Sequence, residues 1–131
     1  MLQNIKTQVQ QPLELFGRIT IGTTGAVSSY SGIEVSSVTK NSHAGDYTIT
    51  LKNVYYKLLS FKAIIQSRAA NSEVFQVEID PASSSGVDAD LLAKVINIQL
   101  YDAAKADVNA ASGSVIIWNA TVRNSAIAAG E

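Results

Sequence analysis

The sequence predicts an all-β protein: an antiparallel β-sandwich or barrel of about seven to eight short strands with an extended N-terminal arm. Three observations lead to this prediction. Apolar and polar residues alternate in at least six segments, which is the period of a strand with one buried face. Turn-forming residues separate these segments, and no segment sustains the period of a helix. Such spacing is typical of sandwiches and barrels.

Composition limits the class of protein further. A chain of 131 residues with 47% apolar and 16% charged residues is expected to fold as one domain with a core. The net charge of −1 gives no broad basic field, so nucleic acid is not an expected partner. No cysteine is present for a disulfide or a thiolate metal site, and no apolar run approaches the length of a membrane span.

The chain divides into an N-terminal arm (1–14), a β-sandwich domain (15–125) and a C-terminal tail (126–131). The arm is polar and rich in glutamine, and Pro12 follows it. It has little to bury by itself, so we expect it to become ordered against a partner. The spacing of Leu2, Ile5 and Val9 leaves a short amphipathic helix as the alternative, and no signal peptide is expected.

The expected strands share alternation and turn residues at their ends. In order they are 15–22, 35–40, 47–51, 59–67, 73–79, 93–101 and 114–123. Segment 26–32 is expected as a loop or a weak edge strand, and segment 54–59 fits either a helical turn or the start of a strand. The stretches 80–90 and 102–113 are expected as loops, the second with one helical turn. The side chains that are expected to point into the core include Phe75, Ile98 and Trp118.

The clearest hairpin joins 35–40 to 47–51. Tyr47, Ile49 and Leu51 alternate with threonines, and the segment 41–45 between the strands has turn formers at both ends. Two other strands, 59–65 and 114–122, are apolar on both faces. Because a solvated sandwich rarely needs apolar residues outside, we expect another subunit to cover Val115 and Ile117.

No catalytic constellation is apparent, so an enzyme is not expected. The segment 22–25 lacks the lysine of a phosphate-binding loop, and the only histidine, His43, is expected at an exposed hairpin tip. A small hydrolase would need a nucleophile, a base and an orienting group together. No cofactor is expected.

Two other groups of residues could each form a binding site or have an ordinary structural role. Asp80, Asp88 and Asp90 offer oxygen ligands for calcium, but their spacing does not match an EF-hand loop, which favours a solvated acidic loop. Aromatic residues offer a sugar-stacking platform, although core and subunit packing is the simpler explanation. These are Tyr55, Tyr56, Tyr101 and Trp118.

Several short motifs resemble small structural proteins of the virions of tailed bacteriophages. That resemblance covers most of 16–125, without the arm, the serine-rich loop or the alanine-rich segment. Its motifs are FGRITIGTTGAV (16–27), SVTK (37–40), GDYTITL (45–51), Tyr55 and Tyr56 through 58–59, GSV (113–115) and VRNS (122–125).

The resemblance implies a capsid decoration (cement) protein: a non-enzymatic, usually trimeric β-fold on the capsid surface of the virion. Its partners would be the major capsid protein and two further copies of itself. The alternative is a tail or head-fibre module that binds a host-surface glycan. The expected partner contacts are Leu2, Ile5, Lys6, Val9, Pro12 and Leu13 in the arm, with Val115 and Ile117 in the domain.

Overall fold

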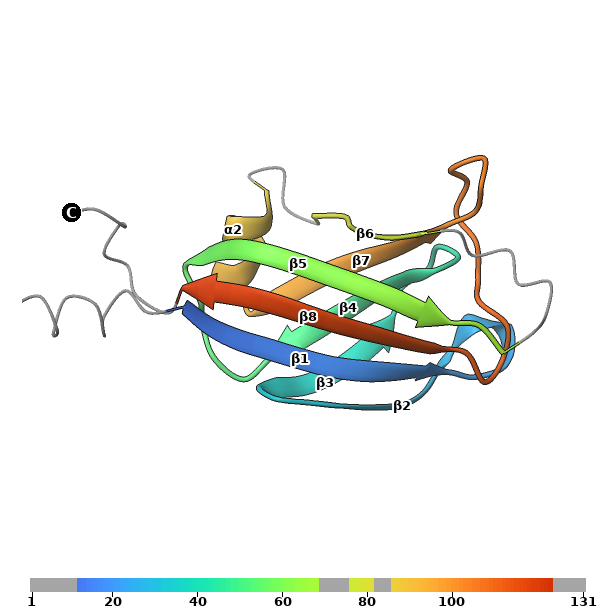
Figure 1. The fold of residues 1–131 in the computed structure, drawn as a ribbon, viewed down its shortest axis with the longest axis horizontal. Coiled ribbons are helices and arrows are strands. Elements are labelled where there is room, and N and C mark those ends of the chain that lie inside the picture. The colour runs from blue at the N-terminus through green and yellow to red at the C-terminus, as the bar shows by residue number, and fades with distance from the viewer. Residues whose placement is uncertain (1–11, 69–75, 82–85, 124–131) are drawn as a thin grey trace, which may run out of the picture.

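Two four-stranded antiparallel sheets face each other in the computed structural model, which describes residues 12–68, 76–81 and 86–123 (Figure 1). Sheet A has the order β2 (Val27–Gly32), β1 (Pro12–Ile21), β8 (Val115–Arg123) and β5 (Lys57–Gln66). Sheet B has the order β3 (Val35–Lys40), β4 (Asp46–Leu51), β7 (Val95–Tyr101) and β6 (Gln76–Ile79). The prediction of an all-β fold with about seven to eight strands is confirmed, and of the two predicted forms the structure is the sandwich, because the sheets do not close into a barrel.

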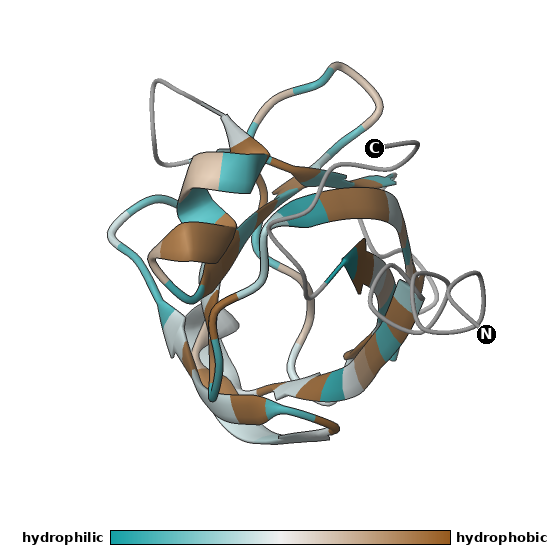
Figure 2. Ribbon diagram, turned by 90° about the vertical axis from the view of Figure 1, so that its left-hand side faces the viewer, coloured by the Kyte–Doolittle hydropathy of each residue, from teal (hydrophilic) through white to brown (hydrophobic). Residues whose placement is uncertain are grey.

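The core lies between the two sheets, where the alternating apolar residues meet. Ile19 and Trp118 point inward from sheet A, and Ile49 and Ile98 point inward from sheet B; all four are almost completely buried. Figure 2 shows the strands from one end of the sandwich, enclosing this interior. Burying each large apolar side chain contributes roughly 1.5–3 kcal/mol.

The predicted hairpin is present as β3 and β4. Val38 pairs with Ile49, and the backbone N–H of Asn41 donates to the carbonyl of Asp46 where the turn closes. Gly45 has φ +70°, a left-handed conformation that favours glycine, and a Cβ there would lie 2.2 Å from the carbonyl oxygen of Val108. His43 is exposed at this tip.

The first strand begins earlier than the sequence indicated. Pro12 opens β1 and pairs with Arg123, so residues 12–14 belong to sheet A and not to an arm. Proline is tolerated there because the first residue of a strand can lack a ladder N–H. Segment 27–32 is an edge strand, and β5 begins at Lys57, which settles the two segments that the sequence left open.

The prediction of a loop over 80–90 is wrong for its last residues, because the helix α2 (Val87–Leu92) begins there. Leu91 is completely buried in the core, so a tertiary contact stabilises a helix too short for its own sequence to specify. Asp88 and Asp90 lie in its first turn, where their negative charges interact favourably with the positive end of the helix dipole. The stretch 102–113 is a loop as expected, but it contains an isolated bridge between Tyr101 and Asp107 and not the expected helical turn.

Some predictions fall outside the described residues: the inward position of Phe75, the tail 126–131, and the arm contacts Leu2, Ile5, Lys6 and Val9. In the part of the chain that the structure describes, no helix is long and apolar enough to span a membrane.

Candidate interaction surface

The outer face of sheet A carries large apolar side chains. The strand registers place Arg18, Ile117 and Ile64 in one row across β1, β8 and β5. Ile64 is 63% exposed and Ile117 36% exposed, and Phe16 on β1 is 49% exposed. Val115 lies one row away on β8 and is half-buried. The two strands that are apolar on both faces, β5 and β8, are thus hydrogen-bonded neighbours in one sheet.

A hollow of about 450 Å³ lies in this face beside β2. Its walls include Phe16, Ile33 and Ile117, and the facing glycines Gly17 and Gly32 form part of its floor. A Cβ on Gly17 would lie 2.5 Å from the carbonyl oxygen of Ser31 and 3.0 Å from the indole of Trp118. We name Phe16, Ile33, Ile64, Val115 and Ile117 the sheet A patch.

Trp118 lies on the core side of the same place. Its ring stacks on Phe61 with the centroids 6.5 Å apart and an interplanar angle of 14°. Its indole Nε1 is buried and has no hydrogen-bond partner among the described residues. The absence of a side chain at Gly17 makes room for this ring, and Trp118 is therefore a sensitive reporter of changes near the hollow.

The charges on this face are mostly basic. The outward positions of sheet A hold four basic side chains and one acidic side chain, a net charge of +3 against −1 for the whole chain. The set comprises Glu14, Arg18, Lys57, Lys62 and Arg123. A partner that covers the sheet A patch therefore meets an electropositive rim.

The outer face of sheet B has a different chemistry. Thr48 Oγ1 donates to Asn97 Oδ1 at 2.5 Å, and Asn41 Nδ2 donates to Thr48 Oγ1 at 2.9 Å. Asn97 Nδ2 in turn lies 3.5 Å from Asp90 Oδ2 on α2. These polar side chains bond to one another, so this face has no apolar patch comparable with that of sheet A in the described residues.

A second hollow, of about 460 Å³, lies beside the start of β1. Its lining includes Leu13, Ile33 and Tyr55, and the Tyr55 hydroxyl donates to Glu34 Oε2 at 3.2 Å. Asn53 Nδ2 donates to the same oxygen at 2.5 Å. Burial raises the pKa of Tyr55, and the charge of Glu34 raises it further. Both hollows share Ile33, at the turn between β2 and β3.

The structure places the predicted contact residues among the described residues in two regions, the outer face of sheet A and the start of β1. Val115 and Ile117 point outward from β8, whereas Leu13 lines the second hollow and Pro12 opens β1. Phe16, Ile33 and Ile64 were not among the contacts predicted from the sequence. For Phe16 and Ile64 a signal was present, because both are apolar residues at alternating positions opposite the inward set.

The other candidate residues do not converge. Trp118 and Tyr55 are buried, Tyr56 is exposed, and Tyr101 is half-buried beneath Lys105, so these aromatic residues form no common stacking platform. Within the described ranges, no three Asp, Glu, His or Cys side chains gather to hold a metal ion. Asp88 Oδ1 instead accepts a hydrogen bond from the Leu58 backbone N–H at 2.9 Å, which fastens α2 to β5.

Comparisons with known proteins give no family for this chain. No protein-family model matches it, and neither a curated protein nor a solved structure shows a significant match.

Proposed function

We propose that this protein is a non-enzymatic virion structural protein of a tailed bacteriophage, which binds the capsid exterior as a homotrimer and stabilises the shell. One observation carries the proposal: the outer face of sheet A leaves Ile64, Ile117 and Phe16 exposed beside one another. Covering such a patch releases roughly 25 cal/mol for each Å² removed from water. The resemblance of most of 16–125 to small virion proteins is the reason for proposing a capsid as the assembly.

In this proposal the sheet A patch is the contact between copies, with Val115 and Ile117 near its centre. A closed ring of copies covers the same patch on every subunit without open-ended growth. The major capsid protein is contacted at the other end of sheet A, where β1 begins at Pro12 and the arm 1–11 precedes it.

Two measurements test the proposal. Light scattering coupled to size exclusion should give three times the chain mass of 13.9 kDa, and a monomer at micromolar concentration would contradict the trimer. Purified virions that carry this chain should contain it in a number comparable with that of the major capsid protein. A handful of copies per virion would instead favour the tail or head-fibre module that binds a host glycan.

A further inference from the structure

Arg123, the last residue of β8, holds a charge that the described part of the protein does not neutralise. The residue is 8% exposed, and its Nε is buried without a hydrogen-bond partner. Among the described residues the one ion pair joins Lys105 to Glu78, with 3.3 Å between Nζ and Oε2. No described carboxylate therefore pairs with the Arg123 guanidinium.

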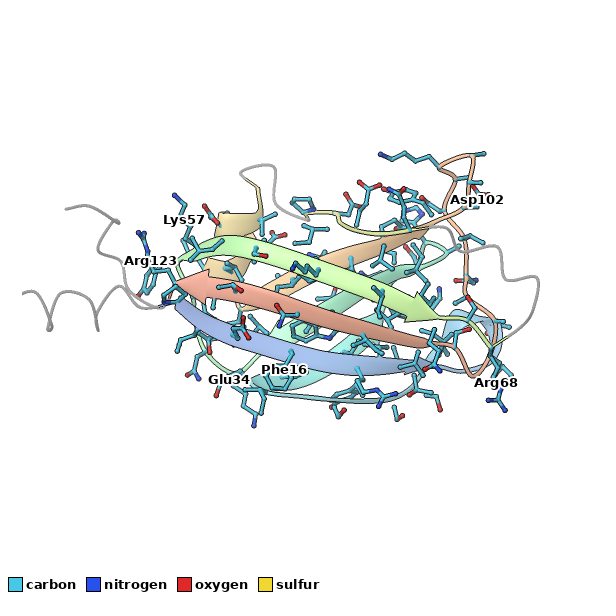
Figure 3. All side chains as sticks on the ribbon, viewed as in Figure 1. Phe16, Glu34, Lys57, Arg68, Asp102 and Arg123 are labelled. Carbon is cyan, nitrogen blue, oxygen red and sulfur yellow. The ribbon has the colours of Figure 1, made fainter. Side chains whose placement is uncertain are left out.

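A second cation lies directly across from it. Lys57 opens β5 and is the cross-strand partner of Arg123, so both project from the same end of sheet A (Figure 3). The backbone N–H of Tyr56 donates to the Arg123 carbonyl at 3.0 Å, which fixes the two strands here. The acidic position on this face, Glu14, is opposite Thr121 and forms no ion pair with Arg123.

Both features raise the free energy of the free protein. The buried Nε of Arg123 loses hydration that no described hydrogen bond restores, and like charges on paired strand positions repel. A carboxylate between Arg123 and Lys57 would relieve both, because guanidinium matches a planar carboxylate with two parallel hydrogen bonds.

We propose that Arg123 and Lys57 form a binding point for the carboxylate of an acidic side chain on a partner protein. The inference rests on the proposed function, in which that partner is a capsid subunit. Leu13 and Leu59 are exposed near this end of sheet A, which favours a protein over a nucleic acid. The source is a capsid subunit and not a second copy, because the copies of the proposed trimer meet through the sheet A patch, whereas Arg123 and Lys57 lie at the end of sheet A where β1 begins and the capsid protein is contacted.

The first test is a titration of the full chain with short peptides. The NMR signals of Arg123 Nε–H and of the Trp118 indole are the readout. The probes are an acetylated, amidated Ala-Glu-Ala-Glu-Ala peptide and its Gln counterpart, at equal ionic strength. We expect the Glu peptide to shift the Arg123 signal and to bind at least about tenfold more tightly than the Gln peptide. Equal binding, no shift at millimolar peptide, or tighter binding of a thymidine oligonucleotide would overturn the proposal.

The second test separates binding from a structural role. Arg123→Met removes the charge but keeps an unbranched side chain, so the melting temperature of the free protein should stay the same or rise. The same variant should lose the preference for the Glu peptide, whereas Arg68→Met, at the other end of sheet A, should keep it (Figure 3). A clear fall in the melting temperature of Arg123→Met would show that the fold itself requires the charge.

Co-sedimentation with capsids distinguishes this inference from the function on which it rests. Wild-type protein that binds capsids while Arg123→Met binds equally well would leave the proposed function standing and overturn the carboxylate site. If the wild-type protein binds no capsid, the proposed function fails, and the peptide titration alone decides whether Arg123 takes a carboxylate.

Discussion

Ile117 on β8 lies directly opposite Ile64 on β5, and both side chains point away from the core on the outer face of sheet A. Paired apolar residues of this kind stabilise a sheet slightly by their mutual contact, yet they leave a continuous apolar surface in water. The pairing makes sheet A the face on which the assembly of this protein can be tested.

The double variant Ile64→Thr and Ile117→Thr should convert trimers into monomers. Threonine keeps the preference for a strand, so folding stability should change by no more than about 0.5 kcal/mol for each exposed site. Light scattering coupled to size exclusion measures the change in mass. Val95→Thr, on the outer face of sheet B, is the matched control and should remain trimeric; a double variant that stays trimeric would place the interface elsewhere.

Gly17→Ala should lower the free energy of unfolding by roughly 1–3 kcal/mol, the usual cost of overpacking. The new methyl group would lie 2.5 Å from the Ser31 carbonyl oxygen, which is backbone and cannot easily move. Urea denaturation followed by the fluorescence of Trp118 gives the measurement. Gly22→Ala is the control, because its nearest neighbour would be 3.4 Å away at Ser28 Cβ and its φ is −99°. Equal effects of the two substitutions would argue against a close contact at Gly17.

Tyr47 should make the protein less stable above pH 10. Its hydroxyl donates to the Gly25 carbonyl, and burial raises its pKa from 10.0 to about 12. The folded state therefore keeps a proton that the unfolded state loses, so its contribution is complete below pH 10 and declines as pH rises toward 12. The loss is on the order of 3 kcal/mol.

Denaturation midpoints between pH 9 and 12 measure this effect in wild type and in Tyr47→Phe. The variant should be less stable near neutral pH, because it lacks the hydrogen bond to Gly25, but its stability should fall less steeply in alkali. Identical slopes in the two proteins would show that other groups cause the alkaline loss.

Deleting residues 1–11 should leave folding and trimer assembly nearly intact while weakening attachment to capsids. The pairing of β1 with β8 begins at Pro12, so the deletion removes none of the described residue pairs of sheet A. Co-sedimentation with capsids stripped of the protein gives the binding, and a melting curve gives the stability. If the truncated protein binds as well as the full chain, the arm is not the attachment element. If it fails to fold, the arm is part of the core.

The sequence by itself determined the strands and their buried faces. Ile116, Trp118, Ala120 and Val122 point inward as predicted, because the alternation of a strand is local and a one-residue shift would expose the whole set. The hairpin of β3 and β4 was equally predictable, since its turn residues and both strands lie within about twenty positions of one another.

The tertiary structure alone decided the rest, because pairing between distant segments leaves no local signal. Nothing near Lys57 indicates that β5 lies beside β8, yet that pairing joins Ile64 to Ile117 and sets Lys57 against Arg123. The helix α2 forms because the core accepts Leu91, and the hollow exists because Gly17 meets Gly32 across two strands. Strand alternation follows from backbone geometry, whereas these contacts follow from the packing of the complete chain.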